Sequence, residues 1–234
     1  MTADGVSLVR VLSDAVAADP RVAQCFASVR FVNALLAEAD DAYPRGPSKM
    51  FFKLFATLRK HPLLHDARST ALSKKDIRMH HQAIFYMEPD NYPCRAFWLD
   101  RLYEEASIPG DFWMRGSILR DGNPTVADYT FSEHINGNAL YRVDDSAFLE
   151  FLSRVSMEMD ADTDGKRYLH SYDVAIDLVR RNRTLFDWLE FTKTASKFQF
   201  TETIQNWYRT RVNATQLCQE NDATYLVHGR EVLF

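Results

Sequence analysis

The chain has 234 residues, 46% of them hydrophobic and 13% aromatic, which is enough to form one sizeable globular domain. Its formal net charge is −4 and both signs are interspersed, which argues against nucleic acid as a partner. Apolar runs are too short for a membrane span, and the N-terminus has no export-signal pattern. As written, the sequence predicts a soluble, cytoplasmic protein with no membrane segment.

The three cysteines Cys25, Cys94 and Cys218 are widely spaced and form no Cys-x-x-Cys motif. This spacing indicates neither a disulfide framework nor a structural zinc site. We therefore interpret all three as free thiols in a reducing compartment.

The N-terminal part of the chain is predicted to be mainly helical. Apolar residues recur at helical spacing over residues 6–26, with a break at Pro20. Residues 28–36 are compatible with either a strand or a helix. Residues 40–47 contain two prolines and a glycine, which predicts a loop.

A further helix is predicted over residues 49–60, with Ser48 in position to cap it. Lys49 and Lys53 lie away from its apolar stripe. Such lysines are usually solvated, but beside a cleft they would neutralise phosphate.

Residues 83–87 are β-prone and apolar without alternation, which predicts a central strand covered on both faces. Pro89 cannot continue a ladder, so Glu88 and Asp90 follow the carboxyl end of this strand. Open α/β sheets bind ligands at that edge. Two carboxylates separated by one residue suit Mg²⁺ or Mn²⁺ bound to a diphosphate, although Glu-Pro-Asp-Asn is also good turn chemistry.

A helix and a strand are predicted to follow. The helix spans residues 97–106, and the strand lies within residues 111–120, where Gly116 would permit a close backbone approach. Strand, helix and strand in this order predict a right-handed crossover. The residues expected on the inner face of the helix are Trp98, Leu99, Leu102, Tyr103 and Ala106.

The segment at residues 133–142 contains Asn136, Gly137 and Asn138, which tolerate a left-handed backbone. A bend there would aim backbone amides into a cleft that binds a sugar or phosphate. Asn-Gly is also a strong hairpin signal, so the pattern fits either structure.

In the C-terminal third we predict helices over residues 146–157 and 171–180, followed by aromatic core at residues 184–191. Asp173 lies in the first turn of the second helix, where the helix dipole favours an acid whatever its function, and where it could serve as a general base. A β-prone run near the C-terminus contains His228. A lone histidine is ordinarily structural, but it becomes a candidate ligand if it meets Glu88 and Asp90.

These segments, in their order, resemble the GT-A fold glycosyltransferases over residues 40–230. Glu88-Pro89-Asp90 is similar to the family's acidic metal motif, and Asn136-Gly137-Asn138 looks like its glycine-containing loop beside the donor sugar. Asp173 matches the acid of its x-E-D motif, and His228 the C-terminal histidine of its metal site. Glu-His-Ile-Asn-Gly-Asn-Ala-Leu-Tyr more narrowly resembles glycosyltransferases of algae and large algal viruses.

The resemblance implies a single α/β domain over residues 1–234, with a mixed, mostly parallel sheet flanked by helices. Glu88, Asp90 and His228 would hold Mn²⁺ or Mg²⁺, and Asp173 would be the base of an inverting transfer. The donor would be a nucleoside-diphosphate sugar, UDP-linked rather than GDP-linked, and the acceptor a carbohydrate or a protein-linked glycan. The residues implied at the donor are Lys49, Lys53, Asn136, Gly137 and Asn138, and those at the acceptor side Trp98, Trp113 or His134.

One departure from the family is the absence of its opening strand, which holds the nucleotide base. We therefore expect an N-terminally truncated domain, and a Golgi-lumenal location if an anchor preceded it. The competing hypotheses are a non-catalytic nucleotide-sugar or carbohydrate-binding domain of the same fold and a structural partner domain.

Overall fold

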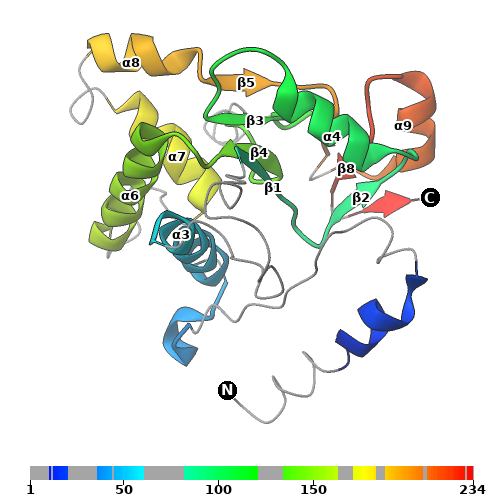
Figure 1. The fold of residues 1–234 in the computed structure, drawn as a ribbon, viewed down its shortest axis with the longest axis horizontal. Coiled ribbons are helices and arrows are strands. Elements are labelled where there is room, and N and C mark those ends of the chain that lie inside the picture. The colour runs from blue at the N-terminus through cyan, green and yellow to red at the C-terminus, as the bar shows by residue number, and fades with distance from the viewer. Residues whose placement is uncertain are drawn as a thin grey trace, which may run out of the picture.

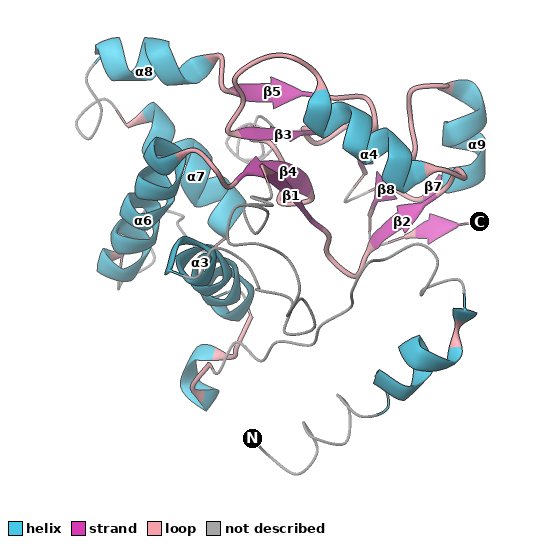
Figure 2. Cartoon of the chain, viewed as in Figure 1, coloured by secondary structure: helices cyan, strands magenta, loops and turns pink. Residues whose placement is uncertain are grey.

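The computed structural model describes residues 11, 13–20, 36–43, 45–60, 82–120, 134–162, 171–182, 188–207, 210–229 and 231–233. Figures 1 and 2 show helices on both sides of small sheets. The elements are η1 (Glu38–Asp40), α3 (Arg45–Lys60), β1 (Ala83–Tyr86), β2 (Asn91–Pro93), α4 (Trp98–Ser107), β3 (Met114–Gly116), β4 (Ala139–Arg142), α6 (Ser146–Ala161), α7 (Tyr172–Arg181), α8 (Trp188–Ala195), β5 (Phe198–Phe200), β6 (Ile204–Asn206), β7 (Val212–Asn213), α9 (Ala214–Glu220), β8 (Leu226–His228) and β9 (Val232–Leu233).

The described strands form three sheets that together contain parallel and antiparallel pairs, which with the helices confirms the α/β class. Their orders are β1-β4-β3-β5, β2-β8-β6 and β7-β9. Antiparallel pairs join β1 to β4, β3 to β4 and β2 to β8, whereas β3–β5, β6–β8 and β7–β9 are parallel. The expectation of a mostly parallel sheet is therefore not met among the described residues, because β4 and β2 run against their neighbours.

β1 is covered on both faces, as predicted, but it lies at one end of its sheet among the described strands rather than at the centre. Ile84 and Tyr86 pack against the helical layer of α3, α6 and α7. Ala83 and Phe85 pack on the opposite face, in the cluster that contains Leu102 of α4. Successive residues of a strand point to opposite faces, so this uniformly apolar run serves two cores at once.

Aromatic side chains from three elements hold the helical layer together. Phe51 of α3 is fully buried and stacks on Tyr172 of α7, with 4.0 Å between the ring centroids. Tyr141 of β4 packs edge-on against Phe51. α3 begins at Arg45, four residues before the predicted start, because Pro47 is compatible with a first helical turn, where the backbone N–H has no intrahelical partner.

α4 is confirmed, but its inner face differs from the prediction. Tyr103, expected inside, is 75% exposed, whereas Glu105 is 4% exposed. Glu105 is buried because it accepts a hydrogen bond from Arg101 at 2.6 Å and lies opposite Arg115 of β3. Apolar spacing alone did not reveal this charged pair, since its partners come from different elements.

β1 and β3 run in the same direction, with β4 between them and antiparallel to both. The predicted close approach at Gly116 is confirmed. A Cβ on Gly116 would lie 2.7 Å from Ile135 Cγ2 and 2.8 Å from Ala139 Cβ.

The prediction of free thiols is wrong for two of the three cysteines. Cys94 and Cys218 form a disulfide whose Cα atoms are 6.3 Å apart, and it joins the end of β2 to α9. A cross-link between residues 124 positions apart stabilises the fold mainly by restricting the unfolded chain. The spacing along the sequence gave no sign of this pairing, which depends on how α9 packs. Cys25 lies outside the described residues.

Several predictions fall wholly or partly outside the described residues. Within 6–26, residues 11, 13–18 and 20 are helical and residue 19 is not, and of residues 28–36 only the last is described. Residues 183–187 are not described, nor is the burial of residues 188–191, so the aromatic core predicted at residues 184–191 is untested. In the described part of the chain we find no helix with the length and apolar content needed to cross a bilayer.

Candidate metal centre

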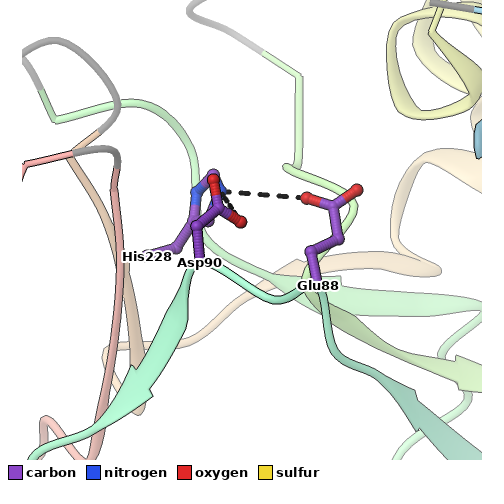
Figure 3. Close-up of side chains that lie close together, drawn as sticks. All are labelled: Glu88, Asp90 and His228. Atoms are coloured by element: carbon purple, nitrogen blue, oxygen red, sulfur yellow. Dashed lines mark ion pairs between the residues drawn. The ribbon is translucent and has the colours of Figure 1, made fainter. Parts of the chain in front are cut away.

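Glu88, Asp90 and His228 converge at one point, as shown in Figure 3. The two acids lie on the link between β1 and β2, and His228 ends β8. β2 and β8 are antiparallel neighbours with Asn91 opposite His228, so the pairing brings the histidine beside the acids. His228 Nε2 is 3.2 Å from Asp90 Oδ1 and 3.8 Å from Glu88 Oε2, and one ligand atom from each residue lies within 4.8 Å of the others.

The backbone explains why both acids point to this place. Residues 88–91 form a turn, in which the Asn91 amide donates to the Glu88 carbonyl at 3.1 Å and Pro89 occupies the second position. The Gly229 amide donates to the Asp90 carbonyl at 3.1 Å, which ties the turn to the end of β8. The turn and the ligand interpretations of this segment are thus compatible, since the turn is what aims the two carboxylates.

His228 is 2% exposed and is oriented by Asn206 of β6. The distance from His228 Nδ1 to Asn206 Oδ1 is 2.8 Å, and the two residues face each other in the parallel pairing of β6 and β8. An imidazole that donates from Nδ1 presents the lone pair of Nε2 to the two carboxylates, which is the arrangement typical of histidine metal ligands. Nothing in the sequence around Asn206 indicated this role.

Glu88 is held by two side chains from other parts of the chain. Its Oε1 accepts from the Tyr172 hydroxyl at 3.0 Å, and its Oε2 accepts from Asn138 Nδ2 at 2.9 Å. Burial first, and then the negative charge of Asp173, raise the pKa of Glu88, while the Tyr172 hydrogen bond and His228 oppose the rise. A nearby divalent cation would favour the charged form.

The Asn136-Gly137-Asn138 segment supports Glu88 from within. Asn138 is fully buried; its Oδ1 accepts from the Glu88 amide at 2.7 Å and from Asn91 Nδ2 at 3.1 Å. The expectation of left-handed backbone is wrong, because Phe97 and Gly110 alone have positive φ among the described residues.

The backbone amides of this segment also point inward rather than into a cleft. The Asn136 amide donates to the Ser117 carbonyl at 2.9 Å, and the Gly137 amide to Asp173 Oδ2 at 3.0 Å. The Asn138 amide donates to Asn136 Oδ1 at 3.0 Å. These amides are occupied in the structure, so the segment positions other residues. Direct donor contact by these three residues remains a prediction.

Gly137 is required because Tyr172 occupies the space of a side chain. A Cβ at this position would lie 1.9 Å from Tyr172 Oη and 2.5 Å from its Cζ. Only glycine lets the hydroxyl of Tyr172 reach Glu88.

We expect Gly137→Ala to displace Tyr172 and to lower the free energy of unfolding by about 2 kcal/mol or more, because an overpacked core must shift rings and backbone. Urea titration followed by circular dichroism measures this change. Tyr172→Phe is the matched variant, since it removes the hydroxyl alone, and its expected cost is about 1 kcal/mol. Equal stability of Gly137→Ala and the parent would contradict the steric explanation.

Asp173 lies beside this centre in the first turn of α7, and it is 7% exposed. Oδ2 accepts from the Gly137 amide at 3.0 Å and contacts His134 Nε2 at 3.2 Å, while Oδ1 accepts from the Ser171 hydroxyl and the Val174 amide. Burial alone would raise its pKa. The charge and hydrogen bond of His134, with those of Ser171 and Val174, outweigh burial and lower the pKa from 3.8 to about 2.

The remaining sequence candidates have other surroundings. Lys49 forms an ion pair with Asp40, and Lys53 is exposed on α3. Trp113 is 4% exposed in the core and donates to Asp145 at 2.8 Å, so it does not present a face to ligands. Trp98 is partly buried and packs against the hydrophobic cluster that contains Leu102. A phosphate-binding role for the lysines remains a prediction.

Comparison with known proteins adds no relative: no protein-family model, curated protein or solved structure matches the chain. The chemistry of the site therefore depends on its own geometry. Two carboxylates and one imidazole nitrogen are a donor set that suits Mn²⁺, Mg²⁺ or Zn²⁺. The separations of 3.2 and 3.8 Å fall in the range expected between ligands of one such ion, about 3 to 4 Å.

Proposed function

We propose that this chain is a metal-dependent inverting glycosyltransferase with a GT-A-like fold, which transfers a sugar from a nucleoside-diphosphate donor to a hydroxyl acceptor. The observation that carries the proposal is the convergence of Glu88, Asp90 and His228. These residues lie up to 140 positions apart in the sequence. The resemblance to the GT-A fold implies a metal site only if these three side chains lie together.

The donor set fits Mn²⁺ or Mg²⁺, with Glu88 fixed by Asn138 and Tyr172 and His228 fixed by Asn206. When bound, such an ion would offset the charge that develops on the leaving diphosphate. Asp90 has the most exposed side chain of the three ligands, at 37%, so a diphosphate would reach the bound ion from the side of Asp90. We propose a UDP-linked donor and a carbohydrate or protein-linked glycan acceptor.

Asp173 is the proposed base, and its contacts set a condition for that role. Both of its oxygens are hydrogen-bonded and its pKa is about 2, so it takes a proton only after one donor gives way to the acceptor hydroxyl. His134 is the only one of these donors that is a side chain from a segment other than the one that carries Asp173. If the acceptor hydroxyl replaced His134 at Oδ2, the hydrogen bond from the Gly137 amide could remain.

The contacts of Asp173 also favour a second function. A carboxylate with four partners and low exposure is also what a domain that binds nucleotide sugars without transferring them would contain. Glu88, Asp90 and His228 would serve such a binding domain equally well.

Calorimetric titration with UDP-sugars, in the presence and absence of Mn²⁺, distinguishes these functions. A transferase should bind the donor only with Mn²⁺ and should release free UDP and sugar slowly, with water as acceptor. Mn²⁺-dependent uptake without any product would assign the binding function. Donor binding that is indifferent to Mn²⁺ would overturn the metal-dependent proposal in both forms.

A further inference from the structure

A cavity of about 160 Å³ lies beside Asp173, on the side of α7 that faces β3 and β5. One of its walls is polar and comes from α7, with Asp173, Asp177 and Arg180 at spacings of four and three residues. These spacings place the three side chains on one face of the helix. Phe198 and Phe200 of β5 also line the cavity.

The polar wall is fixed in place. Asp177 is 7% exposed; its Oδ1 accepts from Arg180 at 2.7 Å and its Oδ2 from Arg181 Nε at 2.7 Å. The guanidinium group of Arg180 also lies 4.9 Å from the centre of the Phe198 ring. Two carboxylates and one already paired guanidinium therefore line the cavity, so an anionic ligand would meet repulsion there. Hydroxyl groups would find fixed acceptors.

The apolar wall presents two phenyl rings to the same face of β5. Gln199 lies between them in sequence and points the other way, to Arg115, as strand alternation requires. Phe198 is partly buried, whereas Phe200 is 66% exposed. An aromatic surface with a few polar groups is the usual lining of small-molecule sites. At about 160 Å³ the cavity is smaller than the roughly 300 to 1,000 Å³ of sites that take drug-sized ligands, so it suits one ring rather than a whole nucleotide.

The cavity adjoins the candidate metal centre through two consecutive residues. The Gly137 amide donates to Asp173, which lines the cavity, and the Asn138 side chain donates to Glu88. A ligand in the cavity would thus lie on the Asp173 side of the centre. We propose that this cavity binds one neutral pyranose ring, with its hydroxyl groups on the α7 wall and its C–H face on the β5 rings. Its role in transfer depends on the proposed function, but the binding itself does not.

The test is saturation-transfer NMR at neutral pH, without metal or nucleotide, using methyl β-D-glucopyranoside, methyl β-D-galactopyranoside and glucuronate. We expect at least one methyl glycoside to bind and glucuronate to give no signal. Phe200→Ser should weaken glycoside binding about fivefold or more, through loss of the ring contact. Phe97→Ser is the matched control, because Phe97 is 78% exposed at the start of α4 and does not line the cavity.

A second variant keeps the proposal testable if Phe200→Ser alters folding. Asp177→Asn keeps the shape of the wall and removes one negative charge, so it should allow glucuronate to bind. Absence of binding by both glycosides, or equal binding in the Phe200 and Phe97 variants, would overturn the inference. So would glucuronate binding to the parent as strong as that of the neutral rings.

Competition with UDP-glucose and Mn²⁺ distinguishes the two sources of the ring. Displacement of the glycoside would place the donor sugar in the cavity, and simultaneous binding would place the acceptor there. Glycoside binding without any uptake of Mn²⁺ or UDP-sugar would overturn the proposed function alone. Mn²⁺-dependent donor binding without glycoside binding would overturn the cavity assignment alone.

Discussion

Asp90→Asn is expected to weaken Mn²⁺ binding on the order of 100-fold or more and to remove Mn²⁺-dependent hydrolysis of UDP-sugars. An amide oxygen carries no charge, so it coordinates a hard divalent cation weakly. Asp90 is also the acid nearest to His228 Nε2, at 3.2 Å. Loss of its charge therefore removes one of the two negative charges that would attract a cation bound by His228. Calorimetry and the paramagnetic resonance signal of free Mn²⁺ measure the affinity directly.

The matched control for this variant is Asp100→Asn. Asp100 is exposed in the first turn of α4 and is not a member of the Glu88, Asp90 and His228 cluster. It should bind Mn²⁺ as the parent does. Unchanged affinity for Mn²⁺ in Asp90→Asn would contradict the metal site, and the contacts among Glu88, Asp90 and His228 would then be structural only.

Asp173→Asn is expected to leave Mn²⁺ and donor binding intact and to reduce sugar transfer by about 1,000-fold, since the amide cannot accept a proton. The variant should also be less stable at neutral pH. The folded-state pKa of about 2, against 3.8 for the unfolded chain, corresponds to roughly 2 kcal/mol. Because this pKa is lowered, the stabilisation is complete above pH 3.8 and is lost as the pH falls through 2.

Urea titrations of parent and variant at neutral and acid pH measure the second effect. The difference in free energy of unfolding should shrink as the pH approaches 2. Ser171→Ala serves as the control, because it removes one donor to Asp173 and retains the carboxylate. Transfer by Asp173→Asn at the rate of the parent would exclude Asp173 as the base, whatever its effect on stability.

Local patterns in the sequence predicted the elements that carry the candidate ligands. The apolar run before Pro89 predicted β1 and the change of direction after it, because proline ends a ladder wherever it occurs. The β-prone run ending at His228 predicted β8, and the acid after Ser171 predicted the start of α7. Each of these signals acts over a few residues, so it does not need the rest of the fold.

The residues that orient the ligands were not predicted, for a physical reason. Asn206 and Tyr172 act through single hydrogen bonds to residues 22 and 84 positions away. The disulfide of Cys94 and Cys218 and the buried Glu105 depend in the same way on partners from distant elements. Hydrophobic periodicity predicts which face of an element is buried, but not which polar group of another element will pack against that face.

The sequence by itself determined the α/β class, the strand and turn that carry Glu88 and Asp90, and the β-strand that ends at His228, since backbone preference and apolar spacing act locally. Only the tertiary structure decided that these three side chains meet, because β2 pairs with β8 across more than half of the chain. It also decided that Gly137 is needed for space rather than for backbone conformation, and that a cavity opens beside Asp173. Those features depend on packing between elements, which no single segment specifies.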